Sequence, residues 1–258
     1  MVFAGKEPTS AELEITYGSY PVHAALSPLT RCRYVELLER FEPYRRYGRI
    51  LDVGSGSGFF LDTAMERGWE AHGTEYDPAM LETCKARGMH MRQGLLAPGN
   101  YEPSSFDVIT SFEVLEHLVH PRPELEHFFS LLRPGGSLYL TTPNFNAISR
   151  RIAGGQWRVV NYPEHLNYYT PYTLSKAVKR PGFRIVSIST TGISLMRIRN
   201  SFSSGSIQEN TDPENDDQKL RNRIENDSTL RLIKSITNRT LTTLGIGDSM
   251  KLLAIKPQ

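Results

Sequence analysis

A glycine-rich turn is the strongest chemical signal in the chain. The segment ILDVGSGSGFFL places Gly54, Gly56 and Gly58 directly after a short apolar run. Glycines are needed where the chain turns tightly and a ligand approaches the backbone, because any Cβ would intrude there. A dinucleotide-binding turn would have its third glycine at position 59, which is Phe59, and no phosphate-loop Gly-Lys pair follows. The turn therefore indicates a nucleoside ligand other than NAD or ATP, unless it is only a glycine-rich connection.

An acidic residue follows at a spacing that fits a ribose. Glu75 ends the next predicted strand, 17 residues after Gly58. A carboxylate at that place can accept hydrogen bonds from both hydroxyl groups of a ribose. The alternative is that Glu75, like Asp77 beside it, only favours the start of the following helix. Together, the glycines and the acid favour a nucleoside ligand more strongly than either does alone.

Two histidines are candidates for a general base. His117 lies in the segment EVLEHL, and His165 lies in the segment PEHLNYY. Histidine titrates near neutral pH, so either side chain could accept a proton from a reacting hydroxyl group. In both cases the alternative is a structural histidine that is hydrogen-bonded to the backbone.

Five segments, taken in order and spacing, match a known family. They are ILDVGSGSGFF, GTEYDP, FDVITSFEVLEHL, LLRPGGSLYLTTPN, and EHLNYYTPYTL with the later PGF. With these segments the chain resembles the class I S-adenosylmethionine-dependent methyltransferases, in the group that includes the ubiquinone-biosynthesis O-methyltransferases. The resemblance implies a Rossmann-like α/β fold with a seven-stranded mixed sheet in the order 3-2-1-4-5-7-6. In that fold, strand 7 is antiparallel and helices cover both faces of the sheet.

The resemblance also implies S-adenosylmethionine as the cofactor. Glu75 would bind the ribose hydroxyls, and Tyr76 would lie against the adenine. Relatives often have an acid where Leu95 stands, so backbone groups of Leu95 and Leu96 are expected to hold the adenine here. The methionine part is expected to contact the turn: Asp52, Gly54, Ser55, Gly56 and Gly58. The sulfonium is expected beside two residues that end the fourth strand: Phe112 and Glu113.

The segment EVLEHL has two interpretations within this family. Relatives place their substrate pocket after the fifth strand, which favours His165 over His117 as the base. The segment also resembles a metal-binding set in which Glu113, Glu116 and His117 would hold Mg²⁺ and oxygens of the acceptor. Because the motif also occurs in relatives with no known metal requirement, Mg²⁺ is the less favoured alternative.

Alternating strands and helices must position these residues. Helical spacing predicts a first helix that starts at Ser27 and Pro28. Strands are predicted at 49–53, 69–75, 89–94, 106–112, 137–144, 183–190 and 250–256. Such alternation implies right-handed crossovers and a parallel sheet covered on both faces. We expect a single domain over 1–258, with an N-terminal helical cap at 1–47 and insertions at about 145–170 and 197–248.

The irregular segments are expected to close the pocket. One is 17–26, and the other is the insertion 145–170, which carries the aromatic residues Trp157, Tyr168 and Tyr169. The insertion at 197–248 is expected to form a lid or a dimer contact. The segment 144–181 contains six basic residues and one acidic residue, a charge that could face an anionic acceptor or only solvent.

Composition limits the partners. The 258 residues include 30 basic and 28 acidic side chains, whereas a nucleic-acid-binding domain would be strongly basic. A small-molecule acceptor, methylated on oxygen, is therefore favoured over the alternatives of an RNA or tRNA methyltransferase and of a catalytically inactive binding protein. The chain has no apolar run of 18 residues and only two cysteines. These features predict a cytoplasmic protein, monomeric or homodimeric, with no membrane span and no secretory signal.

Overall fold

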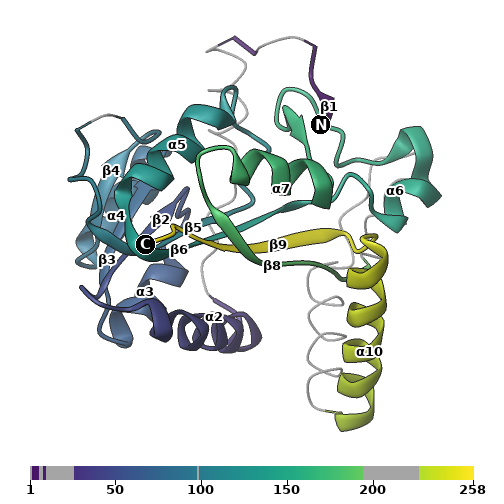
Figure 1. Ribbon diagram of the computed structural model, residues 1–258, viewed down its shortest axis with the longest axis horizontal. Helices are drawn as coiled ribbons and strands as arrows, with labels where there is room; N and C mark the ends of the chain where they lie inside the picture. The colour runs from purple at the N-terminus through teal and green to yellow at the C-terminus, as the bar shows by residue number, and fades with distance from the viewer. Residues whose placement is uncertain (1, 6–7, 10–25, 98, 194–226) are drawn as a thin grey trace.

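A seven-stranded sheet forms the centre of the computed structural model, which describes residues 2–5, 8–9, 26–97, 99–193 and 227–258 (Figure 1). Its strands are β2 (Arg49–Val53), β3 (Glu70–Glu75), β4 (His90–Gln93), β5 (Phe106–Phe112), β6 (Leu132–Pro143), β8 (Arg184–Thr191) and β9 (Ser249–Ile255). Their spatial order is β4-β3-β2-β5-β6-β9-β8. Only β9 runs antiparallel to its neighbours, β6 and β8. Counted along the chain, this is the predicted order 3-2-1-4-5-7-6 with an antiparallel seventh strand.

Helices cover both faces of the sheet, as predicted (Figure 1). On one face lie α2 (Pro28–Phe41), α3 (Phe59–Glu66) and α4 (Pro78–Ala86), whose apolar side chains share one core with the sheet. On the other face lie α5 (Pro121–Leu131) and α7 (Pro171–Lys179), with a second core. The start of α2 matches the sequence prediction, because Ser27 caps the helix and Pro28 is its first residue.

The fifth strand of the sheet begins earlier than the sequence indicated. The segment Pro134-Gly135-Gly136 was expected to end a helix, with the strand starting at 137. Instead, α5 ends at Leu131 and β6 begins at Leu132. The pairing of β5 with β6 shifts between Phe106 and Val108, so the glycines form a bulge inside the strand. Gly135 has a φ of +78°, a value that glycine adopts without strain.

The N-terminal region is helical only in part. Val2–Phe3 forms a short strand, β1, which pairs antiparallel with β7 (Asn167–Tyr168). This pairing brings the start of the chain against the insertion at 145–170 and corrects the expected helical cap over 1–47. A strand of two residues has no readable periodicity, so the sequence could not indicate it. Most of the segment 17–26 lies outside the described residues.

The insertion at 145–170 has structure of its own. It contains α6 (Ile148–Ala153), a 3-10 turn (Gly154–Gln156) and β7. Trp157 is buried in a small separate core with Ala147, Ala153 and Val159. Its Nε1 donates a hydrogen bond to the Ser149 hydroxyl over 3.1 Å. The insertion is thus an ordered unit with its own apolar centre.

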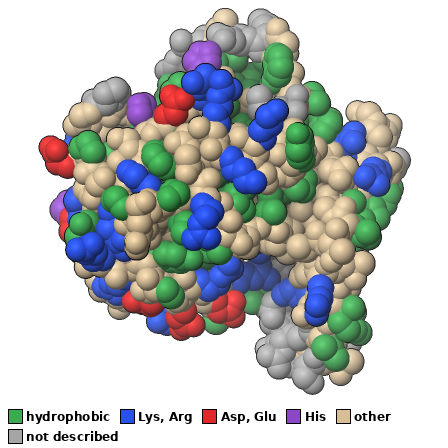
Figure 2. Space-filling model, viewed as in Figure 1, with side chains coloured by type: hydrophobic (Ala, Val, Ile, Leu, Met, Phe, Trp, Pro, Cys, Tyr) green, Lys and Arg blue, Asp and Glu red, His purple; other side chains and the backbone are tan. Residues whose placement is uncertain are grey.

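The second insertion is described only in its last part. Helix α10 (Ser228–Leu244) begins at the cap residue Asp227 and packs on β8, where Thr190 donates to the Leu241 carbonyl over 2.7 Å. Figure 2 shows hydrophobic side chains exposed along this helix. The described residues include no helix with both the length and the apolar character needed to cross a membrane. The role of this insertion as a lid or a dimer contact stays a prediction.

Candidate functional site

The glycine turn joins β2 to α3 at the carboxyl end of the sheet. Gly54, Gly56 and Gly58 have φ values of +73°, +52° and +73°. A Cβ on Gly54 would stand 2.5 Å from Val114, and one on Gly58 would stand 2.6 Å from Cys84. A Cβ on Gly56 would have nothing within 4 Å. Packing therefore requires two of the glycines, whereas Gly56 faces open space in which a ligand can approach the backbone.

Glu75 lies where β3 ends, and it contacts the turn directly. Its Oε2 accepts a hydrogen bond from the Gly56 N–H over 2.7 Å. Its Oε1 accepts from the N–H groups of Tyr76 (2.7 Å) and Asp77 (3.0 Å). Each carboxylate oxygen can accept more than one bond, so hydroxyl donors of a ribose can join these partners. The Tyr76 side chain is exposed and accessible to a ligand.

A hollow of about 180 Å³ opens beside the turn. It is lined by Tyr34, Asp52, Phe59, Phe60, Phe112 and residues 54–58. The ring of Tyr34 lies edge-on to Phe60, with centroids 5.3 Å apart, and 6.1 Å from the ring of Phe112. The sequence indicated Tyr34 only as an apolar position of the first helix, and no motif marks it as a lining residue.

Asp52 is the buried acid of this hollow, with an exposed fraction of 2%. Its Oδ1 accepts a hydrogen bond from the Thr110 hydroxyl over 2.7 Å. Burial raises the pKa of Asp52 to about 7, the Thr110 hydrogen bond opposes this shift, and the negative charge of Glu75 adds to it. In the ligand-free chain Asp52 therefore takes up a proton near neutral pH. A cation bound in the hollow would favour its ionised form.

The segment after β4 reaches the same edge of the sheet. The Gly94 N–H donates to the Glu75 carbonyl over 2.8 Å, which places Leu95 and Leu96 next to Glu75. Leu95 is exposed, as a contact with adenine requires. The Leu96 side chain is buried in the core, and its N–H points to the buried carboxylate of Glu124 at 3.4 Å. This N–H already has a partner, so the expected adenine contact falls mainly on Leu95.

The chain turns sharply where β5 ends. Phe112 lines the hollow, whereas Glu113 has a φ of +53°, which is rare for a residue with a side chain. The Glu113 N–H donates to the Thr141 carbonyl over 3.1 Å, and the Ser249 hydroxyl lies 3.4 Å from its carboxylate. The turn directs Val114 against Gly54 and starts the segment that carries His117.

His117 and His165, the two candidate bases, lie together. Their rings meet edge to face with centroids 4.7 Å apart. His117 Nδ1 lies 2.8 Å from the Glu164 carbonyl, and His165 Nδ1 lies 2.7 Å from the Val159 carbonyl. A carbonyl only accepts, so each Nδ1 carries the proton and each Nε2 is the basic atom. Burial, aided by His165, lowers the pKa of His117, which is therefore neutral at neutral pH.

The group of possible metal ligands differs from the expected set. Glu116, His117 and His165 each offer a ligand atom within 4.8 Å of the others, and Glu113 is not part of this group. Glu116 is buried, and its Oε2 accepts from the Thr142 hydroxyl over 2.9 Å. Two imidazoles and one carboxylate suit a transition-metal ion better than Mg²⁺, which prefers oxygen ligands. The sequence could not bring His165 into the group because it lies 48 residues after His117.

The aromatic residues of the insertion support His165 more than they line a pocket. The Tyr168 hydroxyl donates to the His165 carbonyl over 2.8 Å. Tyr169 is fully buried in the main core, and burial raises the pKa of its hydroxyl. Trp157 lies in the separate core of the insertion. The expectation that these three rings wall off the pocket is therefore wrong for Trp157 and Tyr169.

Comparisons with known proteins agree with this geometry. A family model described as a methyltransferase domain matches residues 29–188. The ubiquinone biosynthesis O-methyltransferase of Aeromonas salmonicida (strain A449) is 28% identical over 172 residues, which are 61% of this chain and 71% of that protein. The protein of the same name from Azoarcus sp. (strain BH72) is 25% identical over 154 residues, which are 55% of this chain and 66% of its own length. A SAM-dependent methyltransferase from Archaeoglobus fulgidus, known from its crystal structure, superposes with a TM-score of 0.57 at 20% identity, covering 88% of this chain and 93% of that chain.

Proposed function

This chain belongs to the class I S-adenosylmethionine-dependent methyltransferases, and from that premise we propose that it methylates a small-molecule acceptor on oxygen. The observation that carries the proposal is the pair of neutral histidines, His117 and His165, whose rings lie 4.7 Å apart. Methyl transfer to a hydroxyl group needs a base, whereas transfer to a more basic nitrogen needs none. The segment that carries His117 leaves from the same edge of the sheet as the glycine turn.

Residues around the hollow would bind the cofactor and keep water away. S-adenosylmethionine supplies a methyl group that is already activated on a sulfonium. Gly56 offers open backbone, Glu75 offers acceptors for ribose hydroxyls, and ionised Asp52 offers a negative charge to the cationic part of the cofactor. The rings of Tyr34 and Phe112 form the apolar wall that excludes water during the in-line displacement.

His165 is the proposed base. The Val159 carbonyl holds the proton on Nδ1, which leaves Nε2 to accept the proton of the acceptor hydroxyl. The Tyr168 hydroxyl and the backbone pairing of the neighbouring strand fix the segment that carries the ring. His117 packs against this ring and is proposed as a second candidate for the same role.

A metal ion is the alternative at the same place, because Glu116, His117 and His165 lie within ligand distance of one another. These three side chains would be the ligands, and a bound divalent ion would lower the pKa of an acceptor hydroxyl. In this version the histidines do not carry the proton themselves. The donor set favours a transition-metal ion over the Mg²⁺ that the sequence motif suggested.

The test combines one substitution with chelation. We expect His165→Ala to lower turnover by about 10²- to 10⁴-fold, the usual contribution of a general base. Its dissociation constant for S-adenosylmethionine, measured by calorimetry, should barely change. The exposed His120, at the start of α5, provides the matched control His120→Ala. Normal turnover in His165→Ala would contradict both versions of the proposal.

Chelation separates the two versions. Activity that persists in excess chelator supports His165 as the base. Activity that is lost in chelator and returns when a divalent ion is added supports the metal ligands instead. Acceptors can be screened by mass spectrometry, which also tests the RNA alternative, and failure to bind S-adenosylmethionine would favour an inactive binding protein. We expect the enzyme to work in the cytoplasm as a monomer or a homodimer.

A further inference from the structure

A second group of possible metal ligands lies at the amino ends of two strands, on the sheet edge opposite the glycine turn. Glu70 and His72 alternate along β3, so they share one face of the sheet. His90 begins β4 and is paired in register with His72. One ligand atom of each residue lies within 4.8 Å of the others. We propose that Glu70, His72 and His90 form a binding site for a transition-metal ion of the zinc class.

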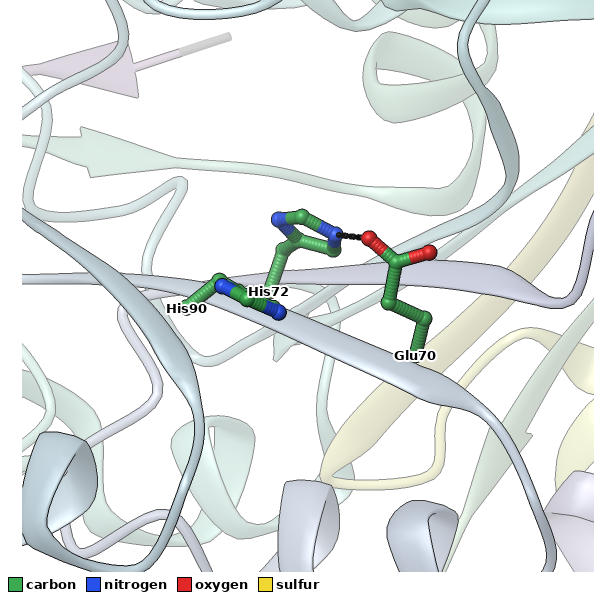
Figure 3. A group of neighbouring side chains, drawn as sticks. All are labelled: Glu70, His72 and His90. Carbon is green, nitrogen blue, oxygen red and sulfur yellow. Dashed lines mark hydrogen bonds and ion pairs between the residues drawn. The ribbon is translucent and has the colours of Figure 1, made fainter.

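The spacing of the first two ligands already suits an ion. Figure 3 shows the Glu70 carboxylate pointing at the His72 ring, with Oε1 and Nε2 2.7 Å apart. Two ligands that each lie about 2.0–2.2 Å from Zn²⁺ can have this separation. The ion takes the place of the proton on Nε2, and the proton moves to Nδ1, so the imidazole stays neutral. Within the described structure Nδ1 is buried without a hydrogen-bond partner, so this shift breaks no hydrogen bond.

The His72 ring is held in place before an ion arrives. It meets Tyr101 and Phe106 edge-on, at 5.6 and 5.1 Å, and it stacks on His90 at 4.7 Å. Its side chain is 6% exposed. Burial lowers the pKa of His72 to about 4 and outweighs the opposing contact with Glu70, so the ring is neutral and able to ligate at neutral pH.

An ion can reach the group from solvent. A hollow of about 470 Å³ opens at this place, and Glu70 and His90 are both exposed. Water from the hollow can occupy the fourth position of a tetrahedral ion that has three protein ligands. The exposed His90 ring, which is stacked parallel to His72, can turn its nitrogen toward the ion.

Positive charges around the hollow oppose this site and offer a sharp test of it. Arg49 Nε lies 3.3 Å from the Glu70 carboxylate, and an Arg49 Nη lies 3.3 Å from His72 Nε2. Arg92, above the ring of Tyr101, and Lys85 also line the hollow. This basic lining would suit an anion such as phosphate. The convergence of two imidazoles and a carboxylate on one point is specific to a cation, and we therefore propose the metal.

The ion would join two strands. β4 lies at the edge of the sheet, and β3 is the strand it pairs with. An ion held by His72 on β3 and His90 on β4 ties this short edge strand to the rest of the sheet. Binding to the folded chain alone then stabilises it by mass action.

The experiment titrates the full chain, without an affinity tag and freed of metal, with Zn²⁺ by calorimetry and with Co²⁺ by visible absorption. We expect His90→Ala and Glu70→Gln each to weaken binding at this site by at least about 10-fold, the lower end of the loss expected at a metal site. The control His120→Ala should bind like the wild type. Zn²⁺ should raise the thermal midpoint of the wild type more than that of His90→Ala. Any ion held by Glu116, His117 and His165 contributes equally to all these proteins.

Arg49→Gln distinguishes a cation from an anion. Removing this charge should tighten Zn²⁺ binding by about fivefold or more, because like charges repel at short range. An anion bound in the hollow would instead be weakened by the same substitution. Equal Zn²⁺ affinity and stoichiometry in the wild type and His90→Ala would overturn the proposal. So would saturable binding of inorganic phosphate that Arg49→Gln weakens, together with no Zn²⁺ binding sensitive to His90.

Discussion

Glu75 combines a structural and a ligand-binding task at the scale of a single residue. Its carboxylate holds the Gly56 N–H and two N–H groups at the start of α4. We predict that Glu75→Ala weakens S-adenosylmethionine binding by about 1–3 kcal/mol, because ribose hydroxyls lose their acceptors. Calorimetry measures the change, and Glu82→Ala, at an exposed ion pair of α4, is the control. An unchanged dissociation constant in Glu75→Ala would remove the ribose role.

The buried carboxyl of Asp52 predicts a pH dependence of cofactor binding. Its pKa is raised from 3.8 to about 7, mainly by burial. The cationic cofactor favours the ionised form, so affinity should rise between about pH 6 and pH 8. In the ligand-free chain the sign is opposite, because the stability that Asp52 contributes is complete below pH 3.8 and is lost as the pH rises through 7. Calorimetry and denaturant titration across this range should show both trends in the wild type, and Asp52→Asn should flatten them.

At the scale of elements, the strand-to-helix turn separates packing from binding. Gly54→Ala should destabilise the fold, because its Cβ would stand 2.5 Å from Val114. Gly56→Ala should cost only about 1–2 kcal/mol, the penalty of the left-handed conformation, because its Cβ meets nothing within 4 Å. The same Cβ would occupy the space of the ligand, so Gly56→Ala should lose cofactor affinity. Denaturant unfolding and calorimetry test the pair, and equal effects on both readouts would contradict this division.

Most elements could be predicted from the sequence because their signals are local. The glycine turn, the cap at Ser27 and the apolar strands each depend on neighbouring residues. The bulge at Gly135 and the pairing of Val2–Phe3 with Asn167–Tyr168 depend on which backbones meet, and no local pattern encodes that.

The candidate site was predicted in the same uneven way. Residues that follow strands, such as Glu75 and Phe112, lie at the expected edge because parallel strands share their carboxyl ends. The approach of His165 to His117 and Glu116 needs the folded insertion, and the stack of His72 on His90 needs strand register. Neither contact could be read from spacing along the chain.

At the scale of the whole molecule, one buried ion pair joins three distant segments. Asp107 on β5 accepts from Arg133 on β6 over 2.6 Å, and from the N–H groups of Tyr47 and Gly48 over 2.7 Å each. The Arg133 guanidinium also donates to the Tyr44 carbonyl. Burial opposes the ionisation of Asp107, but these hydrogen bonds hold its pKa below the usual value.

We predict that Asp107→Ala destabilises the fold by about 3–5 kcal/mol, since it leaves the Arg133 charge buried without its partner. Arg122→Ala breaks an exposed pair with Glu126 and should cost less than about 0.5 kcal/mol. Because the pKa of Asp107 is lowered in the fold, its contribution is present above pH 3.8 and is lost as the pH falls through the folded value. Urea unfolding of both variants at neutral and acidic pH measures these effects. A loss in Asp107→Ala no greater than in Arg122→Ala would contradict the structural role.

The place of β9 has a consequence for the chain as it is made on the ribosome. β9 lies between β6 and β8 but follows both in the sequence, and 105 residues separate Pro143 from Ser249. Synthesis runs from the N-terminus, so β2 to β6 emerge early and can pair as they leave the exit tunnel. Until residues 249–255 emerge, β8 lacks its neighbour and one side of β6 is open to other nascent chains. Translation therefore leaves a half-finished sheet that chaperones must protect until its last strand is inserted.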